Sequence, residues 1–517
     1  MIDHSVNRNA AFEPAPVLPR DVFNERLIAR VHPAQWRNPE PLPRYNLVVI
    51  GAGTAGLTCA AAVAGLGGKV ALIERNLMGG DCLNVGCVPS KILVRSARVL
   101  ADMRSAEDFG VRIPAGIEAD FEWAMERLRR LRARIGQHDS AARFKELGVD
   151  VWFGDARFSA HDAVEVGGVT LRFAKAVIAT GASAMAPDIQ GLAETGFLTN
   201  ETVFNLTQRP RRLLVIGGGP LGCELAQAFR RLGSEVSIIH RNPQFLPQEE
   251  REATQLLAQA FQRDGIQLHL NTEVQRVERR AEGKTLHLLK EAKLTTVDGD
   301  EIFVGAGRAP NVKGLNLEVA GVDYDEEKGV HVDDYLRTSN PLIYAAGDVC
   351  LTTQYTHMAE ATARIVVQNA LFKGRKKLSA LVVPWCTFTD PEIAHVGLYV
   401  RQAHMQKIPV RTYTVPMNDV DRAITDGEEV GFVKIHVRAG SDKIIGATLV
   451  GRHAGEMVNE ITLAMVAGIG LKTIGEVIHS YPTQAEAIRR AADAYNKTRL
   501  TPFLKRLAAR WLTWARR

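Results

Sequence analysis

A unit of one apolar run and three glycines occurs twice in this chain and constrains its fold more than any other feature. The first apolar run covers 46–50 and the second covers 213–216. Each unit predicts a buried parallel strand, a tight turn and a helix whose N-terminus can face a pyrophosphate. Two copies are far more specific than one, and they predict two dinucleotide sites. The glycines correspond in order: Gly51 with Gly217, Gly53 with Gly219 and Gly56 with Gly222.

The end of the following strand differs between the two copies. In the first copy Glu74 can accept hydrogen bonds from a ribose diol. The same spacing in the second copy leads to His240, followed by Arg241. This basic pair favours a ribose 2′-phosphate, so NADPH is expected and NADH is the alternative. A simpler interpretation is that both side chains only face solvent.

Two cysteines, Cys82 and Cys87, follow the first unit at a spacing of a little over one helical turn. If Cys82 opens a helix, both sulfurs can lie on one side and bond to each other. A helix N-terminus also favours a thiolate. The alternative is that the two cysteines are buried and only pack as small apolar residues.

The stretch from Gly79 to Lys91 resembles the redox-active disulfide of the pyridine nucleotide-disulfide oxidoreductases, the family of dihydrolipoamide dehydrogenase, glutathione reductase and mercuric reductase. The resemblance runs from about residue 45 to about 496. It implies FAD in the first unit and NAD(P)H in the second. It also implies that Cys82 exchanges with substrate, while Cys87 lies against the flavin and forms a thiolate charge-transfer complex. Asp81 stands where threonine is usual, and its charge should oppose thiolate formation at Cys82.

The same resemblance assigns roles to residues far from the cysteines. Lys91 is expected to pair with Glu224 near the point where nicotinamide meets flavin. Thr180 and Gly181 correspond to a flavin-contacting turn, and Asp348 to the acidic residue near the ribityl chain and pyrophosphate.

Near the C-terminal end, Tyr481 stands where two branches of the family have a histidine that serves as general acid and base; Glu486 ends the same motif. A phenol with a pKa of about 10 is a poor base near neutrality. His479, two residues earlier, could replace it only with a different backbone path. Tyrosine in this position resembles mercuric reductase, in which it lines the metal-ion path. The chain nevertheless lacks the C-terminal cysteine pair and the N-terminal Cys-x-x-Cys domain of mercuric reductases, and no resident metal site is predicted.

Composition excludes some functions. The net charge of +6 over 517 residues does not indicate nucleic-acid binding. No apolar run reaches the roughly 18 residues of a membrane span. Six cysteines without a secreted framework favour a reducing cytoplasm.

The expected fold is α/β, with two Rossmann-like domains and a C-terminal α+β dimerisation domain that makes a homodimer. The C-terminal stretch is basic and amphipathic; packing on the chain's own dimer is the simpler interpretation, and contact with a membrane surface is the alternative. The predicted segments are an extension (1–43), the FAD-binding domain (44–190 and 305–383), the NAD(P)-binding domain (191–304), the dimerisation domain (384–498) and the basic tail (499–517).

These features predict an enzyme that passes electrons from NADPH through FAD to the Cys82–Cys87 disulfide, and then to a soft metal ion or a disulfide. A dihydrolipoamide dehydrogenase or glutathione reductase type of activity is the first alternative. The second is a flavoprotein redox sensor without turnover.

Overall fold

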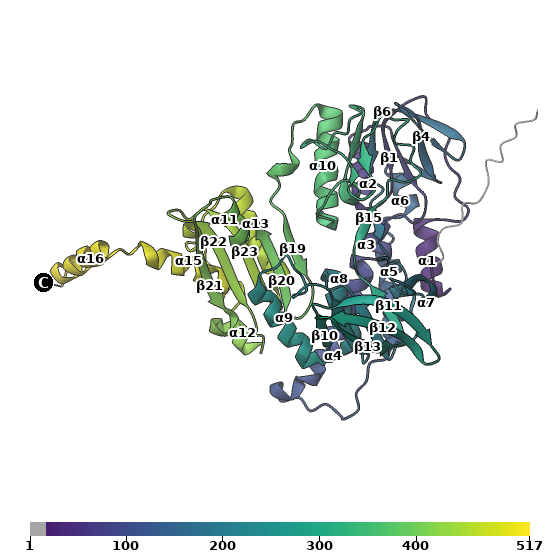
Figure 1. The fold of residues 1–517 in the computed structure, drawn as a ribbon. Coiled ribbons are helices and arrows are strands. Elements are labelled where there is room, and N and C mark those ends of the chain that lie inside the picture. Colours follow the sequence, from purple (N-terminus) through teal and green to yellow (C-terminus); the bar gives the residue numbers. More distant parts are fainter. Residues whose placement is uncertain (1–16, 517) are drawn as a thin grey trace, which may run out of the picture. The chain divides into compact units, whose positions relative to one another are not determined.

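The computed structural model describes residues 17–516, and the chain forms two compact units (Figure 1). The first unit comprises 17–241 and 268–381, and the second comprises 242–267 and 382–516. The fold is α/β, as predicted. Part of the predicted N-terminal extension, 1–16, lies outside the described residues. The rest of it forms helix α1 (Val22–Val31).

The first unit contains a seven-stranded sheet in the order β3-β2-β1-β6-β5-β4, with β18 beside β6. Strands β3, β2, β1, β6 and β18 run parallel, whereas β4 and β5 form an antiparallel extension. The first apolar run of the sequence, 46–50, therefore lies in the central strand β1 and is mostly buried, as is usual for parallel strands. The strands are β1 (Tyr45–Ile50), β2 (Val70–Glu74), β3 (Val149–Phe153), β4 (Ala156–Ala160), β5 (Ala163–Val166), β6 (Val169–Ile178) and β18 (Ile343–Ala345).

The second glycine unit builds a smaller sheet with the order β10-β9-β8-β14. Its glycine turn lies between β8 and helix α8, so the repeat in the sequence is a repeat of structure. A three-stranded antiparallel sheet, β11-β12-β13, accompanies it. The elements are β8 (Arg212–Ile216), α8 (Pro220–Arg231), β9 (Glu235–His240), β10 (Gln267–Leu270), β11 (Glu273–Arg280), β12 (Gly283–Lys290), β13 (Lys293–Gly299) and β14 (Glu301–Val304).

Helices α2 (Thr54–Gly65) and α10 (Thr356–Phe372) belong to the first unit, as do α3 (Gly80–Asn84), α4 (Cys87–Arg104), α5 (Phe121–Ile135) and α6 (Ala141–Glu146). The supposition that Cys82 opens a helix, with Cys87 about one turn further on, is wrong. Cys82 lies inside the short α3, and Cys87 is the first residue of α4. Gly86 separates the two helices with a non-helical backbone (φ −131°, ψ −114°), and the position requires glycine because a Cβ atom there would lie 2.8 Å from the carbonyl oxygen of Asp81.

The second unit is built on the antiparallel sheet β19-β20-β23-β22-β21. Its buried core includes Val396, Ile435, Leu449 and Ile461. Apolar side chains are also exposed on this unit, among them Leu463, Val466 and Ile478. The elements are α9 (Arg251–Asp264), β19 (Pro384–Thr387), β20 (Glu392–Gly397), β21 (Val410–Pro416), β22 (Phe432–Arg438), β23 (Ile444–Gly451), α13 (Ala454–Ala467), α15 (Glu486–Arg499) and α16 (Pro502–Trp514).

Candidate active site

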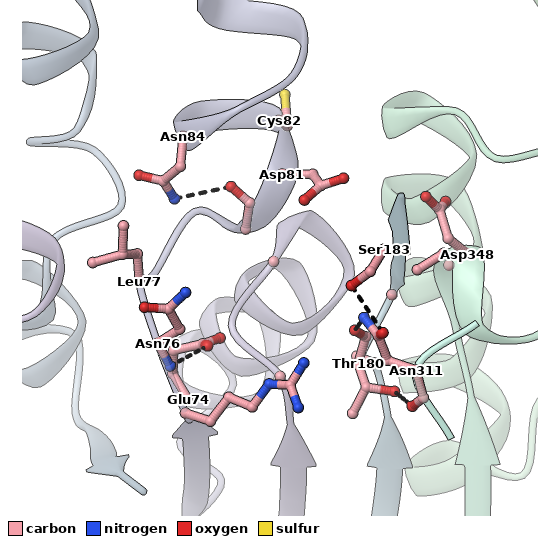
Figure 2. Close-up of a pocket in the computed structure, with 18 of the residues that line it drawn as sticks. Glu74, Asn76, Leu77, Asp81, Cys82, Asn84, Thr180, Ser183, Asn311 and Asp348 are labelled. Carbon is pink, nitrogen blue, oxygen red and sulfur yellow. Dashed lines mark hydrogen bonds between the residues drawn. The ribbon is translucent and has the colours of Figure 1, made fainter. Parts of the chain in front are cut away.

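A cavity of about 550 Å³ in the first unit extends from the carboxyl ends of its parallel strands to the two cysteines. Glu74, Thr180 and Asp348 line it, together with Cys82 and Cys87. Figure 2 shows Glu74 at the end of its strand, with Thr180 and Asp348 on the other side and Asp81 and Cys82 beyond them. Ligands of open parallel sheets bind at this edge.

The glycine turn explains why a dinucleotide can approach this edge. Gly51 has a φ of +102°, and a Cβ atom there would lie 2.4 Å from the carbonyl oxygen of Ala179. A Cβ atom on Gly53 would have no neighbour nearer than 3.8 Å, so this position keeps the turn open toward the cavity instead of filling a packed space. The backbone can therefore come close to a pyrophosphate.

Glu74 reaches into the same turn. Its carboxylate accepts hydrogen bonds from the backbone N–H groups of Ala52 (2.7 Å) and Asn76 (2.8 Å). Burial raises the pKa of Glu74, and the hydrogen bond from Ala52 opposes that rise. The cavity also suits a large polar ligand. Two of the residues that line it, Arg132 and Arg308, each have a buried Nε without a hydrogen-bond partner within residues 17–516.

The second glycine turn repeats the first in detail. Gly217 has a φ of +115°, and its Cβ atom would lie 2.5 Å from the carbonyl oxygen of Gly305. His240 occupies the position equivalent to Glu74. Gly218 N donates a hydrogen bond to His240 Nδ1 over 3.1 Å, as Ala52 N does to the Glu74 carboxylate in the first turn. Since Nδ1 accepts, a neutral ring carries its proton on Nε2. Arg241 is exposed beside it, and no acid ends this strand.

The two cysteines lie together as thiols, and the pair shares a hydrogen bond. This bond from Cys82 lowers the pKa of Cys87 to about 6, against the opposing effect of burial. The same bond, together with burial, raises the pKa of Cys82. Both shifts favour the thiolate at Cys87 and the thiol at Cys82.

Other groups stabilise that thiolate. Thr356 Oγ1 lies 3.2 Å from Cys87 Sγ, and the charge of Lys91 also lowers the Cys87 pKa. Cys87 opens α4 and Thr356 opens α10, so two helix N-termini meet at this sulfur. Lys91 Nζ lies 2.6 Å from Glu224 Oε2, and the Glu224 side chain is only 3% exposed. The structure thus brings together Cys82, Cys87, Lys91 and Glu224, from two distant segments.

The charge of Asp81 is compensated in a way that the sequence did not reveal. Arg308 forms an ion pair with Asp81, and its Nη2 also lies 3.6 Å from Asp348 Oδ2. The same nitrogen donates a hydrogen bond to the carbonyl oxygen of Ala182 over 2.5 Å. The expected opposition of Asp81 to a Cys82 thiolate is therefore offset. Burial raises the pKa of Asp348, and the charge of Arg308 lowers it.

The turn at Thr180 and Gly181 is held by Asn311. Thr180 Oγ1 donates to the Asn311 carbonyl oxygen over 2.7 Å, and Asn311 Nδ2 donates back to the Thr180 carbonyl oxygen over 2.9 Å (Figure 2). Gly181 has a φ of +69°, which suits glycine. Asn311, Arg308 and Thr356 are site residues that sequence reasoning missed. The motif Gly307-Arg308-Ala309-Pro310-Asn311 was a visible signal for two of them.

The remaining candidates lie in the second unit. The Tyr481 hydroxyl donates to Asp421 Oδ2 over 2.9 Å, and this bond raises the pKa of Tyr481. His479 Nε2 lies 2.9 Å from Glu460 Oε1, and its Nδ1 lies 3.2 Å from the Val477 carbonyl oxygen. Glu486 is buried and accepts from Arg489 (2.9 Å) and Arg490 (3.2 Å). The structure therefore does not pair Tyr481 or His479 with Glu486.

Comparison with known proteins agrees with this arrangement. Residues 45–364 match the family described as pyridine nucleotide-disulphide oxidoreductase, and residues 383–492 match its dimerisation domain. The chain is 34% identical over 453 residues to a mercuric reductase of Lysinibacillus sphaericus, covering 88% of this chain and 83% of the relative. It is 35% identical over 468 residues to a dihydrolipoyl dehydrogenase of Thermus scotoductus, covering 88% and 98%.

A solved structure with the same fold is the Cu(II) complex of the HOCl-induced flavoprotein disulfide reductase RclA from Escherichia coli. Its TM-score is 0.78 at 28% identity, and the match covers 88% of this chain and 100% of that one. In residues 17–516 no helix has the length and apolarity that crossing a bilayer requires.

Proposed function

Because this chain belongs to the FAD-dependent pyridine nucleotide-disulphide oxidoreductase family and carries its dimerisation domain, we propose that it passes electrons from NADPH to a soft metal ion, or to a disulfide, through Cys82 and Cys87. The observation that carries this proposal is the position of Cys82 and Cys87 together at the end of the cavity, with Thr356 Oγ1 3.2 Å from Cys87 Sγ. Such a pair can cycle between a disulfide and a dithiol.

The FAD that this family uses supplies two-electron transfer between nicotinamide and disulfide when it is bound. Glu74, the open turn at Gly53, and Asp348 with Arg308 are the groups that would hold it. When two electrons reach the disulfide, the S–S bond breaks. Cys87 leaves as the thiolate, stabilised by Thr356 and Lys91, and Cys82 takes up a proton.

In the second half of the cycle, the dithiol gives two electrons to the acceptor. With Hg(II), the metal is reduced to Hg(0), the S–S bond forms again and the thiol proton leaves. Thiolates are soft ligands, which suits Hg(II) or copper. The Cu(II) complex of the related RclA supports testing copper as well.

The residue at position 481 favours a metal ion over a thiol substrate. Thiol exchange requires a general base, and the Tyr481 hydroxyl, whose pKa is raised, donates to Asp421. Reduction of a metal ion at a dithiol depends least on a general base, so tyrosine in place of histidine at position 481 affects it least. A dihydrolipoamide dehydrogenase that uses His479 as base is the second candidate, suggested by the Thermus relative.

NADPH is the proposed reductant because Arg241 is exposed beside His240, where an acid would favour NADH. Arg241→Ala should raise the KM for NADPH about tenfold, as expected for the loss of one charge-assisted contact, and leave the KM for NADH unchanged. Arg263→Ala, which removes another exposed arginine, is the matched control. Equal effects on both nucleotides would contradict the 2′-phosphate contact.

An anaerobic titration with NADPH, followed by a panel of acceptors, tests the whole proposal. We expect a long-wavelength absorbance band to grow, and NADPH with Hg(II) or Cu(II) to be turned over faster than NAD⁺ with dihydrolipoamide. Cys82→Ser should abolish turnover, whereas Cys386→Ser should not. A faster reaction with dihydrolipoamide that is lost in His479→Ala would establish the second candidate, and no turnover with any acceptor would indicate a redox sensor.

A further inference from the structure

The C-terminal helix α16 is a separate element with its own start. Helix α15 ends at Arg499, and Thr501 caps the next helix by accepting a hydrogen bond from Leu504 N over 3.3 Å. Pro502 occupies the first helical position, where its missing N–H is not needed. The chain therefore stops one helix and begins another, so α16 is not the frayed end of α15.

Helix α16 has one apolar half and one basic half. At 100° per residue, its side chains divide into two unbroken arcs of about half the circumference each. The apolar arc contains Phe503, Leu504, Leu507, Ala508, Trp511, Leu512, Trp514 and Ala515, and the polar arc contains Lys505, Arg506, Ala509, Arg510, Thr513 and Arg516.

The apolar arc is uncovered by the rest of the described chain. Every residue from 501 to 516 is exposed, including Phe503 (67%), Trp511 (63%) and Trp514 (65%). The Trp511 and Trp514 rings lie 5.1 Å apart, so two large aromatic groups sit together on this face. An exposed apolar stripe of this kind requires a partner.

The charge of this segment is of one sign. From residue 494 to residue 517 there are seven lysines and arginines and no aspartate or glutamate. A second copy of α16 would therefore bring cations against cations. The exposed side of α13 that contains Leu463 also carries Glu456 and Glu460, but Glu460 is already paired with His479.

We propose that α16 lies on the surface of an anionic lipid bilayer, with its apolar arc among the acyl chains and its cations at the headgroups. Tryptophan prefers the interface between hydrocarbon and water, and basic side chains are attracted to anionic lipids. At 1.5 Å per residue, the 13-residue helix is about 20 Å long, so it lies in the interface and does not cross the membrane.

The experiment is cosedimentation of the full-length FAD-loaded protein with vesicles of phosphatidylcholine alone or with one quarter phosphatidylglycerol. We expect binding to the anionic vesicles at least about tenfold tighter than to the neutral ones, and weaker at higher salt. Trp511→Glu places a charge in the apolar arc and should reduce binding more than about tenfold. Ala509→Glu adds the same charge to the polar arc and should reduce it less than about threefold.

NADPH-dependent reductase activity and dimer size, measured without lipid, accompany each variant and show that it is folded. Equal binding to neutral and anionic vesicles would overturn the proposal, as would equal loss in both variants. If Trp511→Glu instead converts the dimer to monomers in lipid-free buffer, α16 packs on the second subunit and the proposal is wrong.

Discussion

Removing the Cys82 thiol should raise the pKa of Cys87 in the reduced protein. The hydrogen bond from Cys82 is the largest of the effects that lower this pKa to about 6. It stabilises the thiolate and not the thiol, so its loss in Cys82→Ala must move the pKa upward. Thr356 and Lys91 remain in place and keep part of the shift.

The size of the change follows from the strength of one such bond. A hydrogen bond to a charged group contributes about 1.5–3 kcal/mol, and one pKa unit corresponds to about 1.36 kcal/mol. A thiol is a weak donor, so the lower end of this range applies. We expect a rise of about one unit, from about 6 to about 7. At pH 6 the thiolate fraction then falls from about one half to about one tenth.

The assay is the pH dependence of Cys87 alkylation by iodoacetamide, located by peptide mass spectrometry, in anaerobically reduced protein. The long-wavelength flavin absorbance gives a second, independent midpoint. Cys386→Ala is the control, because it removes a thiol outside the pair. A midpoint in Cys82→Ala that stays within about 0.3 unit of the parent's would refute the reasoning and leave Lys91 and Thr356 as the determinants.

Two further predictions concern buried ion pairs. Lys91→Gln removes the cation that pairs with the buried Glu224, so it should lower the free energy of unfolding in urea by about 2 kcal/mol. It should also raise the pKa of Cys87, which the charge of Lys91 lowers. If neither the free energy of unfolding nor the Cys87 pKa changes, the pairing is contradicted. In the second unit, burial acts to raise the pKa of Glu250, but His436 and Lys434 outweigh it and lower that pKa to about 2. The ionised Glu250 therefore contributes stability above about pH 4.3, and this contribution is lost as the pH falls toward 2. Glu250→Gln should lower the free energy of unfolding by about 3 kcal/mol at neutral pH and remove its dependence on pH between about 2 and 4.3. Parallel pH profiles of the free energy of unfolding for variant and parent would contradict this prediction.

Local signals predicted the fold well because the glycine turns can be made in few ways. Gly51 and Gly217 have no room for a side chain, so their pattern fixes strand, turn and helix in both copies. The family and the α/β architecture predicted from the sequence are confirmed. The six-segment division of the chain stays a prediction, as do the roles of the site residues.

Contacts between distant segments were beyond local reasoning. Arg308 reaches Asp81 across more than two hundred residues, and only the order of the strands brings them together. The repeat gave the position of His240, but not that its ring would turn into the glycine loop as Glu74 does. Nor could spacing show that Gly86 divides the cysteine segment into two helices.

The N-terminal helix α1 supports the segment between the cysteines through one buried cation. Arg132 donates to Asn24 Oδ1 and to the carbonyl oxygen of Asn84, each over 2.7 Å, and Leu27 of α1 lines the cavity. A shortened protein that began at Tyr45, where the family match starts, would lose the Asn24 contact of Arg132 and keep the bond to the Asn84 carbonyl oxygen. The predicted N-terminal extension therefore helps, through α1, to hold the segment between Cys82 and Cys87, and its removal should loosen the packing of that segment.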